Sequence, residues 1–338
     1  ATWTLDALEL RDAIQEGNLG KSAYQKLASD VNTSVRDVVS MQGTLVVAHS
    51  GAAGDYDDIA AVESMMDEQG IDSFDRYMAL TTRDYNGMAG NLAGRTNMAA
   101  RKSVSAWEKS FVGDVANFET YKMDSGKRIT AAAGGGSITI ATNGSQADFV
   151  PRATQTSVAG PINVDNRYQT VTVSSTTSVA AGDAFTIAGV ESVHHITKEA
   201  TGQLKTFRVI SVDSGTTMTI SPPIIGATSS PTDAELAYKN VELTSESGTA
   251  AIVWLNQTTA AANAFWHKDS IEILPGSYSV PTDQGVGVMR GTTDQGIEVV
   301  MTKFFNNQTF VSEFALDVRY GVVNTNPEMN GIMLFGQS

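Results

Sequence analysis

Cysteine is absent from this sequence, so neither a disulfide framework nor a thiolate metal site can hold the fold together. Long apolar runs are also missing, because no stretch approaches the roughly 20 apolar residues of a membrane-spanning helix. We therefore expect no membrane partner. Basic residues are outnumbered, with 23 Lys and Arg against 37 Asp and Glu and a net charge of −14. That balance argues against a nucleic-acid-binding surface.

The sequence is, by contrast, rich in apolar residues. The chain has 338 residues, of which 41% are hydrophobic. That length and composition suit one core fold with an insertion.

The clearest pattern lies in the middle of the chain, in residues 163–190. Apolar and polar residues alternate over 170–173, which is the two-residue period of a half-buried strand. A turn at 181–183 follows, and Phe185 and Ile187 resume the alternation. Two further strands are predicted at 204–212 and 218–220, before Pro222 and Pro223 end the run. Short strands at this spacing predict a small antiparallel β-barrel inserted into a mixed α and β chain.

A long amphipathic helix is predicted over residues 22–42. Its capping box is Ser22 with Gln25, although a start nearer Asn18 also fits, and Gly43 is the natural stop. The apolar residues recur at steps of three and four and draw one stripe, expected to be buried. They are Tyr24, Leu27, Ala28, Val31, Val35, Val38 and Val39.

The other predicted elements surround the barrel. A glycine-rich stretch, 131–136, is typical of a flexible junction. The strands are expected at 44–48, 77–81, 115–121, 297–305 and 311–323. Helices are expected after an N-cap at Asp55, burying Ile59, Val62 and Met66, and over 97–111, burying Ala100, Val104, Trp107 and Phe111. Residues 252–255 and 265–274 are expected to rejoin the body that is formed by the segments before the barrel.

Two histidine groups are the strongest candidates for chemistry. His49 lies near Asp55, Asp57 and Asp58 in the sequence and could bind a divalent metal with them. The acidic residues also stand where a helix N-terminus favours negative charge, which is the simpler interpretation.

The second group is His194 with His195. Adjacent strand residues point to opposite faces, so this pair is poorly placed to chelate one ion, and no third ligand is nearby. No G-x-S-x-G, Walker A or H-E-x-x-H motif occurs. We therefore predict no catalytic, cofactor-binding or metal residue.

Several short motifs, in order along the chain, resemble a known family. They are Leu8-Glu9-Leu10-Arg11-Asp12, Asn163-Val164-Asp165-Asn166-Arg167, Gly182-Asp183, Ala188-Gly189-Val190, Asn263-Ala264-Phe265-Trp266 with Ile271-Glu272-Ile273, Tyr320-Gly321-Val322 and Pro327-Glu328. The chain looks like a tailed-phage major capsid protein of the branch found in short-tailed temperate Salmonella phages. Proteins of that branch carry an extra β-barrel inside the capsid fold that tailed phages share with the herpesvirus capsid floor.

The resemblance implies an α+β tailed-phage major capsid fold. It has a long spine helix, peripheral and axial domains, and an inserted antiparallel β-barrel domain. The implied order is a peripheral segment and spine helix at 1–43, the first part of the axial domain at 44–124, the inserted barrel at 125–250, the axial return at 251–284 and a β-rich closing segment of the peripheral domain at 285–338.

The implied function is structural, not enzymatic. Copies of the chain would assemble, as pentamers and hexamers, into the icosahedral head that encloses the double-stranded DNA of a tailed phage. Implied partners are scaffolding and portal proteins during assembly in the host bacterial cytoplasm, and packaged DNA without sequence-specific binding. The final location would be the virion capsid. A loop joining subunits is expected near residues 146–160, and the family's N-terminal arm and extended loop precede the part that this chain resembles.

Two other classes of function stay open at this point. A β-rich virion decoration protein, or a glycan- or receptor-binding protein, predicts a barrel lined by exposed aromatic side chains. Here Phe185 and Phe207 fall at core positions of the alternation. A metal-dependent hydrolase would depend on His49 and the neighbouring Asp residues.

Overall fold

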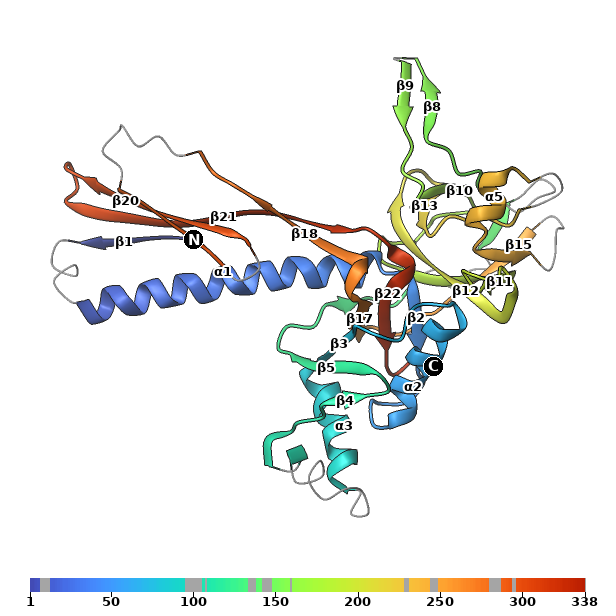
Figure 1. The fold of residues 1–338 in the computed structure, drawn as a ribbon, viewed down its shortest axis with the longest axis horizontal. Coiled ribbons are helices and arrows are strands. Elements are labelled where there is room, and N and C mark those ends of the chain that lie inside the picture. Colours follow the sequence, from blue (N-terminus) through green and yellow to red (C-terminus); the bar gives the residue numbers. More distant parts are fainter. Residues whose placement is uncertain are drawn as a thin grey trace. The chain divides into compact units, whose positions relative to one another are not determined.

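The computed structural model describes residues 1–6, 13–94, 105–106, 108–132, 138–141, 148–158, 160–227, 231–243, 249–279, 287–293 and 296–337. The chain forms two compact units. The first combines Ala1–Arg36 with Glu272–Val323, and the second combines Asp37–Ile271 with Asn324–Ser338. Figure 1 labels the elements of each unit.

The first unit is built on a five-stranded sheet, in which the predicted strands near the end of the chain are confirmed. Trp3 stacks on Phe314 of the neighbouring strand with ring centroids 5.4 Å apart, and Leu5, in the same strand as Trp3, is buried. The strand order is β1-β21-β20-β19, with β18 also pairing with β21. The strands are β1 (Thr2–Asp6), β18 (Ile271–Gly276), β19 (Gly287–Thr292), β20 (Glu298–Asn306) and β21 (Val311–Asn324).

The long helix α1 (Ala13–Gln42) contributes its residues up to Arg36 to this unit. It ends before Gly43 as predicted but begins well before Ser22. Gly17 and Gly20 lie inside its first turns, and a glycine costs about 1 kcal/mol in a helix interior, which is why the sequence favoured a later start. Established helix adds residues cooperatively and so extends through them.

The apolar stripe of α1 is less buried than predicted. Val39 is 1% exposed, but Tyr24 is 56% exposed and Val31 is only half-buried. The expectation of a fully buried stripe is therefore wrong. The 3.6-residue period reveals which face of a helix is apolar, but not how much of that face a neighbouring element covers.

The second unit contains a six-stranded mixed sheet of order β2-β22-β17-β3-β5-β4. Helices α2 and α3 cover one of its faces. One core cluster joins Ile59 and Met66 of α2, Tyr85 of α3 and Met78 of β3. The elements are β2 (Leu45–Ala48), α2 (Tyr56–Glu68), β3 (Arg76–Thr81), α3 (Thr82–Gly94), β4 (Asp114–Val115), β5 (Phe118–Met123), β17 (Asn263–His267) and β22 (Asn330–Leu334).

The same unit contains the predicted barrel, a seven-stranded antiparallel sheet that is nearly closed. Its order is β10-β13-β12-β11-β15-β7, with β14 also pairing with β11. A bridge between Ile140 and Val173 brings the two end strands together. Phe185 stacks on Phe207 at 5.6 Å inside it. The strands are β7 (Thr139–Ala141), β10 (Gln169–Thr172), β11 (Ala184–Val193), β12 (Ala200–Val212), β13 (Thr217–Ser221), β14 (Val241–Leu243) and β15 (Thr249–Trp254).

Two sequence expectations need correction, and one helix of the structure was not predicted. Residues 252–255 do not rejoin the body that is formed by the segments before the barrel, because β15 pairs with β11 and β7 in the barrel. Helix α3 was not predicted, although Tyr85, Met88 and Ala89 are buried at helical spacing and only its glycines argue against it. Phe111 is 56% exposed instead of buried. Residues 97–104, Trp107 and most of the glycine-rich junction lie outside the described residues.

Small elements complete the second unit. A hairpin of β8 (Thr154–Ser157) and β9 (Gly160–Asn163) stands out from the barrel in Figure 1. The others are β6 (Arg128–Ile129), which pairs with β16 (Ala260–Ala261), the short helix α5 (Asp233–Tyr238), and the 3-10 turns η2 (Lys268–Ser270) and η3 (Pro327–Met329). None of the described helices is both long enough and apolar enough to span a bilayer.

Candidate assembly surfaces

The acidic group beside His49 serves the start of α2. Asp58 Oδ2 accepts hydrogen bonds from the backbone N–H of Gly54 at 3.0 Å and of Asp55 at 3.1 Å. Asp55 is the N-cap, as predicted, and the negative charge complements the helix dipole. His49 Nδ1 lies 3.6 Å from Asp58 Oδ1, and its ring stacks on Phe335. Across the described residues, no three potential metal-ligating side chains gather around a common point.

The second histidine pair follows β11 in a turn and not within a strand. His194 Nδ1 accepts hydrogen bonds from the N–H of Ile196 and Thr197 at 3.2 and 3.3 Å. His195 donates its backbone N–H to the carbonyl of Gln69. Burial lowers the pKa of the His195 imidazole, against the opposing attraction of Glu328. Both histidines therefore organise the place where the barrel meets the α2 region.

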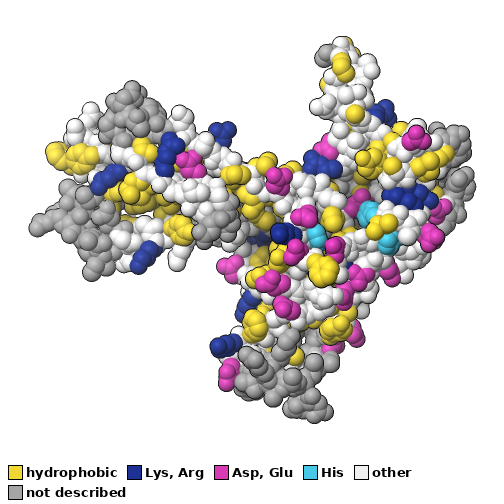
Figure 2. All heavy atoms as spheres, viewed as in Figure 1, with side chains coloured by type: hydrophobic (Ala, Val, Ile, Leu, Met, Phe, Trp, Pro, Cys, Tyr) yellow, Lys and Arg dark blue, Asp and Glu magenta, His cyan; other side chains and the backbone are white. Residues whose placement is uncertain are grey.

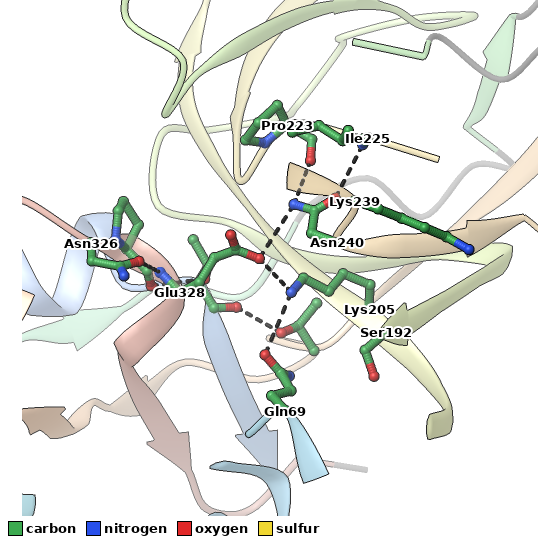
Figure 3. Close-up of polar contacts among 12 residues, drawn as sticks. Gln69, Ser192, Lys205, Pro223, Ile225, Lys239, Asn240, Asn326 and Glu328 are labelled. Carbon is green, nitrogen blue, oxygen red and sulfur yellow. Dashed lines mark hydrogen bonds and ion pairs between the residues drawn. The ribbon is translucent and has the colours of Figure 1, made fainter. Parts of the chain in front are cut away.

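That meeting place is a buried polar junction, which Figure 3 shows in detail. Lys205 of β12 is fully buried, and its Nζ lies 2.5 Å from Glu328 Oε1 of η3. Asn240 Nδ2 donates to the same carboxylate oxygen at 3.3 Å and to the Pro223 carbonyl at 2.9 Å. Gln69 Oε1 accepts from Lys205 at 3.5 Å. The junction joins the barrel to the six-stranded-sheet body through one ion pair and its hydrogen bonds.

The charges at the junction depend on one another. Burial alone raises the pKa of Glu328, but the Lys205 ammonium, His195 and two hydrogen bonds together hold that pKa below its ordinary value. A carboxylate is stabilised in this way only while its cation stays in place. Removing either partner leaves a buried, unpaired charge.

A second buried cation ties the barrel to the end of α1. Arg208 of β12 donates from Nη2 to the carbonyl of Ser40, in the last turn of the helix. Burial lowers the pKa of Arg208 to about 10, and Asp183 opposes that shift. A cation at the C-terminus of a helix also interacts favourably with the helix dipole.

Most side chains of the β8–β9 hairpin are exposed. Val158 is fully exposed at its turn, and Ile162 is 49% exposed. Asn166 clamps the base, accepting from the Arg152 N–H at 3.1 Å and donating to the Arg152 carbonyl at 3.0 Å. A lone two-stranded hairpin is marginally stable in water, so this one is expected to gain order from contact with another surface. It overlaps the expected joining loop near 146–160, of which 146, 147 and 159 lie outside the described residues.

Exposed aromatic side chains also gather at the turn between β20 and β21 in the first unit. Phe304, Phe305 and Phe310 are 51%, 46% and 66% exposed, and Phe305 meets Phe310 edge-on at 6.2 Å. Figure 2 shows apolar side chains at this end of the sheet and on the hairpin of the second unit. Clustered apolar exposure of this kind marks a contact surface. In the barrel, by contrast, Phe185 and Phe207 are completely buried and present no aromatic platform.

Comparison with known proteins places these surfaces in context. The family model described as "P22 coat protein - gene protein 5" matches residues 1–336. The solved "CUS-3 coat protein I-domain" is 43% identical, over 36% of this chain and 96% of that chain, with a TM-score of 0.27. The capsid of the cyanophage P-SCSP1u is 8% identical, over 100% of this chain and 72% of that chain, with a TM-score of 0.41.

The mature capsid of bacteriophage PhiM1 is also 8% identical, over 99% of this chain and 69% of that chain, with a TM-score of 0.39. Because these TM-scores are low, the family model carries the assignment.

Proposed function

The chain belongs to the P22 coat protein family, and from that premise we propose which of its surfaces join neighbouring subunits in the shell. As a member it is a major capsid protein that forms the phage head, a structural protein and not an enzyme. Its work is self-association. Each copy must make slightly different contacts at five-fold and six-fold positions, so projecting loops matter as much as cores.

The exposed β8–β9 hairpin is the observation that carries the proposal. Its strands have almost wholly exposed side chains, and apolar surface is present at its turn, from Val158, and nearer its base, from Ile162 opposite Gln155. We assign this hairpin as an arm that contacts a neighbouring copy. The apolar turn of Phe304, Phe305 and Phe310 is the corresponding contact of the first unit.

The domain organisation belongs to the same proposal. Peripheral segments at 1–43 and 285–338 and axial segments at 44–124 and 251–284 frame an inserted barrel at 125–250, except that β15 (Thr249–Trp254) belongs to the barrel and β22 (Asn330–Leu334) to the six-stranded sheet. We also propose pentamers and hexamers as the units of the shell, scaffolding and portal proteins as assembly partners, and the host cytoplasm as the place of assembly.

The shell encloses the packaged DNA, but the subunit does not bind it tightly. With 37 acidic residues against 23 basic ones, the average field of the subunit repels a duplex, and a wall that bound phosphate would hinder packaging and release. We expect no retention of double-stranded DNA by the soluble subunit at physiological salt. Sub-micromolar binding with a steep salt dependence would contradict this.

The test of the hairpin compares two charge-insertion variants. Val158→Asp/Ile162→Asp places two charges on the hairpin, whereas Ile196→Asp/Val253→Asp places two charges on other exposed apolar sites of the barrel, which are 78% and 49% exposed. Light scattering and electron microscopy would measure the yield of closed shells, and circular dichroism would check the fold. We expect both variants to fold and only the hairpin variant to lose most of its shells.

Equal shell yields from the two variants would contradict the role of the hairpin. Failure of the unmodified chain to form any closed particle, with or without a scaffolding protein, would contradict the assembly proposal as a whole.

A further inference from the structure

A cavity of about 530 Å³ lies at the foot of the β8–β9 hairpin, within the roughly 300 to 1,000 Å³ of typical ligand pockets. Arg152 precedes the hairpin and Arg167 follows it, and both line the cavity. The opposite walls come from Pro222 and Pro223 after β13, from Tyr238 of α5, and from the loop that enters η3. All of these segments belong to the second unit.

Most charges around the cavity are already paired. Arg167 forms a bidentate contact with Asp165, the shortest at 2.6 Å, and donates to the Asn324 carbonyl at 2.5 Å. Glu328 is held by Lys205. Arg152 is exposed, and among the described residues its guanidinium has no partner. The cavity therefore offers the positive charge of Arg152 to a ligand. The side chain of Asn166 holds the Arg152 backbone through hydrogen bonds to its N–H and its carbonyl.

Apolar surface predominates in the rest of the lining, which also includes the polar residues Asn166, Ser221, Thr325 and Asn326. Pro222 and Pro223 are buried residues of the lining with little conformational freedom, and Tyr238, also in the lining, is 66% exposed. Tyrosine and arginine are, together with tryptophan, the side chains enriched at the energetic centres of protein interfaces. A site with one guanidinium beside proline and tyrosine fits a peptide segment that carries a carboxylate next to an aromatic ring.

This chain itself presents such a segment. Phe74 is 76% exposed and stands between Asp72 and Asp75. Its N–H donates to Asp72 Oδ1 at 3.3 Å, which fixes the loop. Asp75 Oδ2 already lies 3.8 Å from Lys268 Nζ, so Asp72 is the more available carboxylate.

We propose that the cavity seats the Asp72–Asp75 loop of a second copy, with the Asp72 carboxylate on Arg152 and the Phe74 ring against Pro222, Pro223 and Tyr238. The proposal rests on the self-assembly of the chain, which makes another copy the neighbour at hand, and on charge complementarity. The two halves are different segments of one subunit, an arrangement that is compatible with a heterologous contact repeated around a ring.

The first test uses the soluble full-length chain and a peptide probe. The probe is an acetylated, amidated peptide with the sequence of residues 71–76, carrying a dye and followed by fluorescence anisotropy. We expect saturable binding that Arg152→Gln weakens about tenfold, as expected for loss of a charge-assisted hydrogen bond. Arg83→Gln, which removes another exposed arginine, is the matched control and is expected to bind like the parent.

Two altered probes test the chemistry of the loop. Peptides with Asp72→Asn or Phe74→Ala are each expected to bind several-fold more weakly than the parent peptide. Binding that is unchanged by these replacements, or by Arg152→Gln, would overturn the proposal.

A charge swap tests the contact in the assembled state. Arg152→Asp and Asp72→Lys are each expected to lower the yield of closed shells, and the double variant Arg152→Asp/Asp72→Lys to restore it, because every copy then carries both reversed halves. A double variant as defective as the single ones would overturn the pairing. If the unmodified chain formed no shells, the proposed function would fail, while the peptide titration would still decide the role of the cavity.

Discussion

Lys205 and Glu328 lie 123 positions apart in the chain and form the central ion pair of the junction between barrel and sheet body. Both side chains are largely withdrawn from water, with exposed fractions of 0% and 18%. The desolvation that this requires is offset only when the pair is complete and hydrogen-bonded. The strength of the contact between the barrel and the sheet body therefore depends on these two residues.

We predict that Lys205→Met destabilises the chain by about 3 to 5 kcal/mol, because it leaves the Glu328 carboxylate buried and unpaired. Adding Glu328→Gln removes that charge, so the double variant is expected to cost clearly less than the sum of the two single ones. Urea unfolding measures each value. The control is Lys268→Met, which removes a well-exposed partner of Asp75 and is expected to cost about 1 kcal/mol or less. Additive single costs would show that the two residues do not interact.

The same junction predicts a dependence on pH. The folded-state pKa of His195 is lowered by burial, so the unfolded chain binds that proton first, and stability falls as the pH drops through about 6.5, the ordinary histidine value. Glu328 also has a lowered pKa. Its contribution is present above about 4.3, the ordinary glutamate value, and is lost as the pH falls further.

We predict that His195→Asn flattens the stability profile between pH 7 and pH 5 and leaves the steeper loss below pH 4. Chemical denaturation at a series of pH values measures this. At pH 8 the profiles of parent and variant are expected to run parallel, because His195 is neutral there in both the folded and the unfolded chain. An unchanged slope between pH 7 and pH 5 would mean that His195 does not titrate in this way.

At the scale of elements, α1 shows how one helix can serve different environments along its length. Its last turn is buried around Val39 and receives Arg208 at the Ser40 carbonyl. Earlier, Ser34 Oγ lies 2.8 Å from the Tyr320 hydroxyl, while much of the apolar stripe keeps contact with solvent.

We predict that Val39→Asp destabilises the chain by about 3 kcal/mol or more, since it buries an unpaired charge. Val31→Asp, the same change on the half-buried part of the stripe, is expected to cost only about 1 kcal/mol. Thermal and urea unfolding of the two variants provide the comparison. Equal losses would show that the stripe is buried along its whole length.

At the scale of the whole molecule, the barrel is organised to fold by itself. Its strands pair with one another, and its core is a separate cluster that includes Phe185, Phe207 and Trp254. β15 is essential to that core because it lies between β11 and β7. Asn256 just beyond it donates to the carbonyl of Thr130 and accepts from the N–H of Ala184.

We predict that a fragment of residues 125–257 folds cooperatively, whereas a fragment of residues 125–250 does not. The shorter fragment lacks most of β15, including Ile252 and Trp254, and so loses a central strand and part of the core. Circular dichroism and an amide NMR spectrum measure both. A dispersed spectrum and a sharp melt for the shorter fragment would show that β15 is dispensable.

The sequence by itself determined the elements whose signals are local. Alternation at 170–173 and from Phe185, with turn residues between, predicted β10 and β11, and Asp55 predicted the start of α2. These signals suffice because side-chain period and turn chemistry depend on neighbouring residues alone. Lys205 shares its strand phase with the core residues Phe207 and Val209, but its ammonium reaches Gln69 and Glu328 outside the barrel core, which local alternation does not indicate.

Only the tertiary structure decided what those elements meet. The pairing of β15 with β11, the partner of Lys205 at Glu328 and the half-covered stripe of α1 all depend on residues far away in the chain. A strand's alternation is the same whichever strand it joins, and an amphipathic helix has the same period whether or not its face is covered. For that reason the barrel could be predicted from the sequence, whereas the junction that holds it, and the cavity at the foot of its hairpin, required the folded chain.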